Sequence, residues 1–208
     1  MSGGGAFDAS RAPPRHDASR IGLLGGSFNP AHDGHRDVSV CALDALRLDA
    51  VWWLVSPGNP LKDPGEYAPY EERLATARRV ANHRRIVASD FERRKGLQYT
   101  VDTLRMVTDL WPQARFVWLM GADSLRDFHR WRDWREIASL APIAVFNRPG
   151  HEEAPVGAEA AIELAAFKVD SAEASSILEK EPPAWAFIGR TANPTSSTDI
   201  RRRMDRRD

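Results

Sequence analysis

The chain has 208 residues, of which 42% are hydrophobic and 28% charged, the ordinary composition of one globular domain with a sizeable core. Its 29 basic and 29 acidic residues cancel to a formal net charge of zero, so the chain as a whole exerts no long-range attraction on nucleic acid. No apolar run approaches the ~18–20 residues of a membrane span, and no apolar signal core stands near the start. Cys41 is the only cysteine, which excludes an intrachain disulfide and fits a cytoplasmic protein. We expect no membrane and no nucleic-acid partner, and a buried, inert thiol at Cys41.

The apolar pattern predicts strands and helices that alternate along the chain. Residues 1–19, rich in Gly, Ser, Ala and Pro, are predicted to form a disordered leader, and residues 20–208 a single domain. Short apolar runs predict strands over residues 20–26, 50–57, 84–89, 114–121, 141–150 and 184–189, and all but 84–89 end at glycine or proline. Helical spacing predicts helices over residues 33–48, 70–83, 99–111 and 196–204, and one or two within 123–140. Residues 157–167 are a weaker helix candidate, and residues 58–69 are predicted to be a loop.

This alternation predicts an α/β fold with a Rossmann-like, doubly wound parallel sheet and helices on both faces. In such sheets ligands bind beyond the carboxyl ends of the strands. Three glycine-bearing segments follow predicted strands, and we expect them to meet at one edge of the sheet: 25–36, 56–65 and 120–124.

The segment "GGSFNPAHDGHR", residues 25–36, carries the first chemical signal. Gly25 and Gly26 let the backbone turn tightly and approach a ligand. His32 and His35 stand at the entrance of the next helix, where free N–H groups favour anions and imidazoles can donate further hydrogen bonds to phosphate. Additional hydrogen-bonding side chains come from Ser27 and Asn29.

Three other interpretations of this segment deserve weight. It could be a structural turn with two histidines at a helix start, since short motifs give false matches. Zinc binding by the histidines would need three or four ligands, and the sequence offers no Cys/His cluster to complete the set. Neither the G-x-G-x-x-G dinucleotide fingerprint nor the Walker pattern G-x-x-x-x-G-K-[ST] is present. We therefore predict a phosphate loop of another kind.

The segment resembles the signature G-[ST]-F-[DN]-P-x-H-x-G-H of the nucleotidyltransferase superfamily. A second hallmark of that superfamily, a hydroxyl-rich turn before an arginine, is matched by "TSSTDIR", residues 195–201. Four further segments are similar to elements of bacterial nicotinate mononucleotide adenylyltransferases: "SPGNPLKD" (56–63), "YTVDTL" (99–104), "LMGADSLRDFHRWRDWREI" (119–137) and "NRPG" (147–150). The resemblance covers residues 20–204.

The resemblance implies adenylyl transfer from ATP to nicotinate mononucleotide in NAD biosynthesis, with release of pyrophosphate. The attacking phosphate is ionised near pH 7 and needs no general base, so the protein must bring two polyanions together and stabilise the transition state. His32, His35 and Arg201 are the implied catalytic residues. The implied ATP and phosphate ligands are Gly25, Gly26, Ser27, Phe28, Lys62, Gly121, Asp123, Ser197 and Thr198. Mg²⁺ is the expected cofactor, bound mainly through ATP phosphates rather than by a protein metal site.

Recognition of nicotinate mononucleotide is also assigned by resemblance. Trp131 matches the tryptophan that stacks on the pyridine ring, and Tyr99 and Thr100 match the element whose backbone N–H groups bind the nicotinate carboxylate. Four other tryptophans lie in predicted strands and are expected in the core: Trp52, Trp53, Trp118 and Trp185.

Alternatives remain open at this point. Within the superfamily, the chain could be a phosphopantetheine adenylyltransferase or a cytidylyltransferase, although segments 99–104 and 119–137 argue against both. From another class, it could be a non-catalytic nucleotide sensor or an RNA-binding module that uses the arginine-rich end "IRRRMDRRD". The sequence leaves open whether the protein is a monomer or a homo-oligomer.

Overall fold

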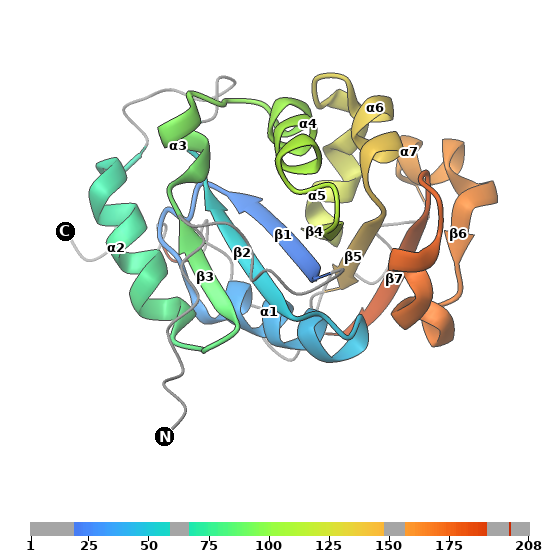
Figure 1. The fold of residues 1–208 in the computed structure, drawn as a ribbon, viewed down its shortest axis with the longest axis horizontal. Helices are drawn as coiled ribbons and strands as arrows, with labels where there is room; N and C mark the ends of the chain where they lie inside the picture. The colour runs from blue at the N-terminus through green and yellow to red at the C-terminus, as the bar shows by residue number, and fades with distance from the viewer. Residues whose placement is uncertain (1–18, 59–66, 148–156, 191–199, 201–208) are drawn as a thin grey trace.

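The fold is a single seven-stranded sheet with helices on both sides (Figure 1). The computed structural model describes residues 19–58, 67–147, 157–190 and 200. Every strand pair in the sheet is parallel, and the strand order is β3-β2-β1-β4-β5-β7-β6. The predicted α/β class and doubly wound parallel sheet are confirmed.

The elements alternate almost as the apolar pattern predicts. The strands are β1 (Arg20–Gly26), β2 (Ala50–Val55), β3 (Ile86–Ser89), β4 (Arg115–Gly121), β5 (Ile143–Asn147), β6 (Lys168–Val169) and β7 (Trp185–Arg190). The α-helices are α1 (Asp33–Ala45), α2 (Tyr70–Ala81), α3 (Phe91–Lys95), α4 (Thr100–Leu110), α5 (Ala122–Asp127), α6 (Trp134–Leu140) and α7 (Glu159–Glu163). Short 3-10 helices are η2 (Phe128–Arg130), η3 (Ala165–Phe167) and η4 (Ser171–Glu179).

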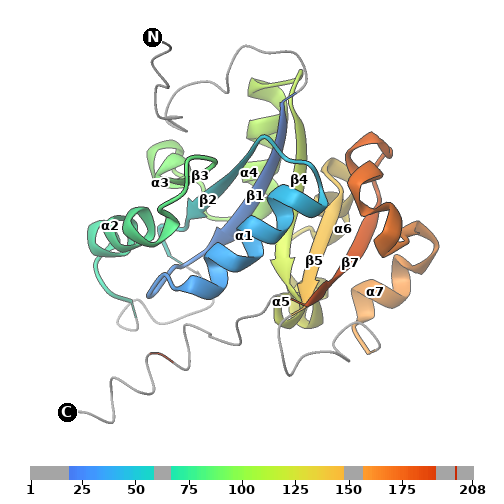
Figure 2. The same ribbon diagram turned by 90° about the horizontal axis from the view of Figure 1, so that it is seen from below.

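Two separate apolar cores lie on the two faces of the sheet (Figures 1 and 2). Successive side chains of each strand point to opposite faces, so Leu23 joins one core and Leu24 the other. Helices α3 to α7 cover the first face, and α1, α2 and η4 cover the second. Because β1 lies between β2 and β4, the strand order reverses beside β1, which creates the crevice where ligands bind in such sheets.

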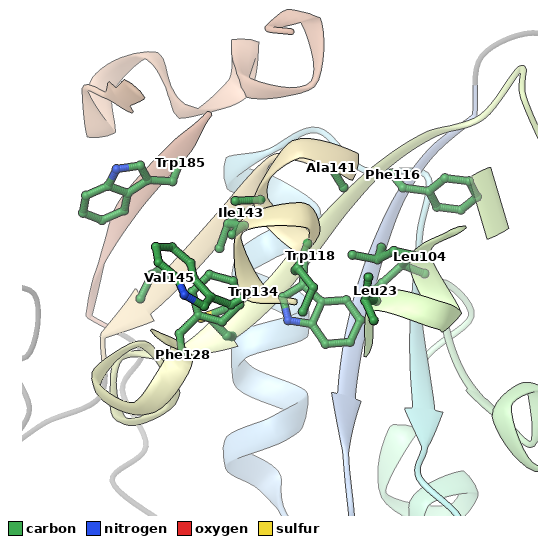
Figure 3. Close-up of a cluster of buried hydrophobic side chains, with 14 of the residues drawn as sticks. Leu23, Leu104, Phe116, Trp118, Phe128, Trp134, Ala141, Ile143, Val145 and Trp185 are labelled. Atoms are coloured by element: carbon green, nitrogen blue, oxygen red, sulfur yellow. The ribbon is translucent and has the colours of Figure 1, made fainter. Parts of the chain in front are cut away.

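The tryptophans expected in the core are there. Trp52 and Trp53 are fully buried, and Trp118 and Trp185 are 1% and 4% exposed. Figure 3 shows Trp118 beside a cluster that includes Phe128 and Trp134 from the 122–140 region. Phe128 and Trp134 meet edge to face with ring centroids 5.6 Å apart, so the short helices of this region are fixed by aromatic packing.

Some predictions require correction. Segment 123–140 holds two α-helices, α5 and α6, joined by η2, which confirms the prediction for it, whereas α3, β6 and η4 are elements that the sequence did not predict. Cys41 is only half-buried because it lies at the flank of α1, whose core face is formed by Val38, Ala42 and Leu43. Burial and the carboxylate of Asp44 still raise the pKa of the Cys41 thiol.

Ser19, which was expected in the leader, packs with the sheet. Ser19 is buried, and its carbonyl accepts a hydrogen bond from the Arg115 amide at 2.9 Å, which extends the β1–β4 pairing by one residue. The rest of the predicted leader lies outside the described residues, as does most of the predicted helix 196–204. Within the described ranges, none of the helices has the length and apolar character needed to cross a bilayer.

Candidate active site

The candidate site lies at the carboxyl ends of β1, β2 and β4, which are neighbours in the sheet. Gly26 at the end of β1 pairs with Val55 at the end of β2, and β4 ends at Gly121 on the other side of β1. The three glycine-bearing segments therefore start from one edge of the sheet, as predicted. The described part of the second segment ends at Gly58.

His32 and His35 lie together at the start of α1. Their ring centroids are 3.9 Å apart, and His32 is the N-cap residue of the helix. The backbone N–H of His32 donates to Nδ1 of His35 at 3.3 Å. Because a neutral imidazole carries one proton, an accepting Nδ1 places that proton on Nε2. His35 can therefore donate a hydrogen bond through Nε2–H at the N-terminus of α1, a position that favours bound anions.

An aromatic floor supports His35. The ring of Phe28 lies 4.7 Å from the His35 ring and is stacked on Trp53 at 5.0 Å. The indole N–H of Trp53 donates to the Ser39 hydroxyl at 2.7 Å, and that hydroxyl donates to the His35 carbonyl at 2.8 Å. The core of the protein thus fixes both the ring and the backbone of His35.

Phe28 has a structural task that the sequence did not reveal. Its side chain is 1% exposed, so only its backbone could serve the predicted ATP site. Its φ of +48° lies in the left-handed region, which a bulky residue adopts only when its surroundings compensate the strain. Burial of the ring against Trp53 supplies that compensation.

Gly25 is required by packing and not by the expected turn, because it lies within β1 and is not among the described residues with positive φ. A Cβ built on Gly25 would lie 2.5 Å from Cη2 of Trp118, closer than side chains tolerate. At Gly26 the nearest atom, in the Phe28 ring, is 3.5 Å away, which is ordinary contact. The indole ring of Trp118 therefore packs directly against the backbone of the signature segment, residues 25–36.

Asn29 uses its side chain within the protein. Its Oδ1 accepts a hydrogen bond from the Ala68 amide at 3.1 Å, which ties the signature segment to the residues that precede α2. The Asn29 side chain, which was expected to offer hydrogen bonds, therefore binds the protein's own backbone at Ala68.

The residues expected to bind nicotinate mononucleotide lie on the face covered by α4 to α6. Tyr99 is the N-cap of α4 and Thr100 its first residue, so the free N–H groups of that helix start beside them. Trp131, after η2, is half-buried and meets Trp118 edge to face at 6.3 Å. Because Trp118 also contacts Gly25, one buried indole connects the signature segment with Trp131.

Ion pairs join the two parts of this acceptor wall, which we define as residues 99–105 and 131–136. Arg105 on α4 makes a two-pronged contact with Glu136 on α6, at 2.7 and 2.6 Å. The guanidinium of Arg132 lies 4.5 Å from the centre of the Tyr99 ring. The Tyr99 and Trp131 segments are thereby held against each other.

A buried carboxyl group, that of Glu92, contacts the acceptor wall at Thr103. Glu92 on α3 is 6% exposed, and its Oε1 accepts a hydrogen bond from the fully buried Thr103 hydroxyl at 2.9 Å. Burial raises the pKa of Glu92 to about 7, although the Thr103 hydrogen bond acts in the opposite direction. The Thr103 hydroxyl also lies 3.3 Å from the Tyr99 carbonyl, so this pair supports the start of α4.

The remaining predicted site residues divide into two groups. Gly121 is the N-cap of α5 and Asp123 lies in its first turn, exposed at the site edge of β4. Four predicted residues lie outside the described part of the chain: Lys62, Ser197, Thr198 and Arg201. Their roles stay predictions.

Sequence reasoning missed two charged residues that the fold buries here, Glu92 and Arg73. Arg73 could have been found, because it shares the helical stripe of Leu74, Ala77 and Ala81 that turns α2 toward the core. Glu92 gives no such signal, since α3 has only five residues and no clear period.

Comparison with known proteins identifies the family. The sequence profile of the cytidylyltransferase-like family matches residues 23–203. A probable nicotinate-nucleotide adenylyltransferase of Methylorubrum extorquens is 52% identical over 184 residues, which is 88% of this chain and 100% of the relative. The similarly named protein of Gluconacetobacter diazotrophicus is 48% identical over 88% of this chain and 85% of its own.

Solved structures show the same fold. The nicotinic acid mononucleotide adenylyltransferase of Plasmodium falciparum, solved with APC, matches 90% of this chain and 83% of its own with a TM-score of 0.62. The same protein solved with NaAD gives a TM-score of 0.64 over 88% of this chain and 83% of its own. Sequence identity is 18% in both cases, so these matches establish the fold alone.

The sheet, the paired histidines at the start of α1 and the profile match place the chain in the cytidylyltransferase-like family of nucleotidyltransferases. Identities near 50% over nearly the whole of its relatives place it more narrowly. The chain belongs to the nicotinate-nucleotide adenylyltransferases, the group that its sequence motifs resemble.

Proposed function

We propose that this protein catalyses adenylyl transfer from ATP to nicotinate mononucleotide, giving nicotinate adenine dinucleotide and pyrophosphate in NAD biosynthesis. A phosphate oxygen of the mononucleotide attacks the α-phosphorus of ATP and forms a new P–O bond. The bond from that phosphorus to the bridging oxygen of the β-phosphate breaks, and pyrophosphate carries away its electron pair. Family membership at 52% identity supports the reaction, and the site supplies the groups it needs.

The observation that carries the proposal is the fixed donor at His35. Because Nδ1 accepts the hydrogen bond of the His32 amide, the imidazole proton lies on Nε2, and this N–H can donate to a phosphate oxygen. Donors aimed at the phosphorus centre stabilise the charge that grows in the transition state and need no reorganisation when the reaction occurs. His32 is the neighbouring phosphate ligand, and Arg201 with Ser197 and Thr198 would bind the β- and γ-phosphates.

Magnesium would enter with ATP. Among the residues that the structure describes, no three His, Cys, Asp or Glu side chains gather around a possible metal position. Mg²⁺ keeps several water ligands and takes substrate phosphates readily, so a donor set without a carboxylate cage fits an ion carried by the triphosphate. When bound, the ion would neutralise charge on the leaving pyrophosphate.

The acceptor wall favours the acid over the amide mononucleotide. Backbone N–H groups at Tyr99 and Thr100 would donate to a carboxylate, whereas an amide would present its own N–H₂ to the same donors. Mismatched buried polar groups cost about 1–3 kcal/mol each, which predicts a preference of roughly ten- to a hundredfold in kcat/KM.

Product identification tests the proposal. The protein is incubated with ATP, Mg²⁺ and one acceptor at a time: nicotinate mononucleotide, nicotinamide mononucleotide or phosphopantetheine, with CTP replacing ATP in parallel. We expect nicotinate adenine dinucleotide as the main product. Product only with phosphopantetheine or only with CTP would contradict the assignment, and equal kcat/KM for acid and amide would contradict the specificity alone.

A further inference from the structure

Arg73, on the first turn of α2, is a buried cation beneath the signature segment. It is 3% exposed, although arginine is rarely buried to this degree without a charged partner. Its guanidinium donates four hydrogen bonds, all to backbone carbonyls: Ser27 at 2.6 Å, Ser56 at 2.9 Å, Pro57 at 3.1 Å and Ala68 at 3.1 Å.

These carbonyls belong to three segments that are distant in sequence. Ser27 follows β1 in the signature segment, Ser56 and Pro57 follow β2, and Ala68 precedes α2. Ala68 is held from its other side as well, because its amide donates to Oδ1 of Asn29 at 3.1 Å. One planar, rigid donor group therefore sets the spacing between the loops that leave the carboxyl ends of two neighbouring strands.

The charge of Arg73 is balanced only by neutral groups in the described structure. No carboxylate of the described residues forms an ion pair with it, and its remaining neighbours are the rings of Tyr67 and Tyr70, at 5.4 and 5.2 Å. Removing a charge from water without a counter-charge is costly. A polyanion bound on the signature segment would supply that counter-charge.

We propose that Arg73 is a positioning residue for ATP: it fixes the signature segment at Ser27 against the end of β2 and places a positive charge behind the triphosphate. This inference rests on the proposed function, since it takes ATP as the ligand of that segment. Arg73 donates to backbone on the protein side of the loop and so acts through Ser27. Its effect should fall on ATP and spare the acceptor, whose expected ligands lie on the opposite face of the sheet.

The test compares three variants. Arg73→Met removes the charge and the donors, Arg73→Lys keeps the charge but loses the planar fork, and Arg78→Met is the matched control, an exposed arginine on the same helix. The dissociation constant of Mg·ATP is measured by calorimetry without acceptor, and KM for each substrate and kcat are measured by pyrophosphate release. Thermal unfolding of each variant establishes that it is folded.

We expect Arg73→Met to lower kcat/KM for ATP about 10²-fold, the loss that a misplacement of reacting groups by about 1 Å can cause. Arg73→Lys should recover about tenfold of that loss, and KM for the acceptor should stay within about threefold in both. Arg78→Met should behave as the wild type.

Two results would overturn the inference: equal ATP affinity in Arg73→Met and Arg78→Met, or an acceptor KM that rises by the same factor as the ATP KM. If Arg73→Met does not fold, Arg73→Lys decides, because unchanged ATP affinity in that variant contradicts a positioning role. The calorimetric measurement needs no turnover. A wild type that binds ATP but does not adenylylate nicotinate mononucleotide would refute the proposed function and leave the role of Arg73 measurable.

Discussion

Replacement of Glu92 by glutamine should change how the stability of the protein depends on pH. Glu92 is 6% exposed and accepts a hydrogen bond from Thr103 at 2.9 Å. Glutamine has the same shape and its side-chain oxygen can accept the same bond, so the substitution removes the ionisation with little change in packing.

The size of the effect follows from the pKa. Burial raises the pKa of Glu92 from its ordinary 4.5 to about 7. At about 1.4 kcal/mol for each pKa unit, this rise corresponds to about 3 kcal/mol of folding free energy. Between these two values the folded protein holds a proton that the unfolded chain releases, so stability falls as pH rises through the window. The contribution of Glu92 is complete below pH 4.5 and lost above about pH 7.

Urea unfolding of both proteins from about pH 4.5 to about pH 8 checks this reasoning, because titrations common to both cancel in the difference. The free energy of unfolding of the wild type minus that of Glu92→Gln should fall by about 3 kcal/mol as pH rises. Glu72→Gln, an exposed carboxylate on α2, controls for the loss of one negative charge. A flat difference, or one that rises with pH, would refute the account of Glu92 as a carboxyl group held neutral by burial.

Four further predictions concern the site. His35→Ala should lower kcat about 10²–10³-fold while the protein stays folded, and near-normal steady-state turnover would contradict the donor role. Gly25→Ala should cost about 1–3 kcal/mol of unfolding free energy in urea, because its Cβ meets Trp118 at 2.5 Å, whereas Gly26→Ala, with ordinary contacts, serves as the control; equal effects would contradict the packing argument. Trp131→Ala should raise KM for both acid and amide mononucleotides and leave KM for ATP nearly unchanged; a parallel rise in the ATP KM would argue that the ring is only structural. Arg201→Ala should impair the use of ATP strongly and Arg203→Ala weakly, because the helix that the sequence predicts over residues 196–204 would turn the two side chains in different directions; similar kinetics for both would indicate a general basic surface.

The sequence predicted every strand of the sheet except β6, because parallel strands buried on both faces form continuous apolar runs. "AVWWLV" is such a run, and the structure buries all of β2. The predicted strand ends also indicated the position of the candidate site, because parallel strands bring their carboxyl ends to one edge of the sheet. The short elements escaped prediction for the opposite reason: β6 has two residues and α3 five, too few to show a period.

The motif predicted which residues lie at the candidate site, but it did not distinguish side chains that could face a ligand from side chains that stabilise the fold. Phe28 is among the expected ATP ligands, yet its side chain lies in the core. Asn29 was expected only to offer a hydrogen-bonding side chain, and it binds the loop before α2. Arg73 and Trp118 contact the segment from positions 46 and 93 residues further along the chain, counted from Ser27 and Gly25. Contacts over such distances depend on the folded arrangement and leave no local pattern. The cytoplasmic location and the disordered leader stay predictions.

The way the acceptor wall is assembled bears on how this enzyme family could diversify. Tyr99 and Trp131 lie on one continuous stretch of chain, residues 99–140, whose helices are cross-linked to each other by Arg105 and Glu136. The paired histidines lie in the earlier segment 25–36, whose Phe28 belongs to the core on the opposite face of the sheet. That segment packs at Gly25 against Trp118, which also contacts Trp131. Mutation within the acceptor wall alone, residues 99–105 and 131–136, could therefore select a different molecule to be adenylylated while the histidine pair at the start of α1 stays unchanged.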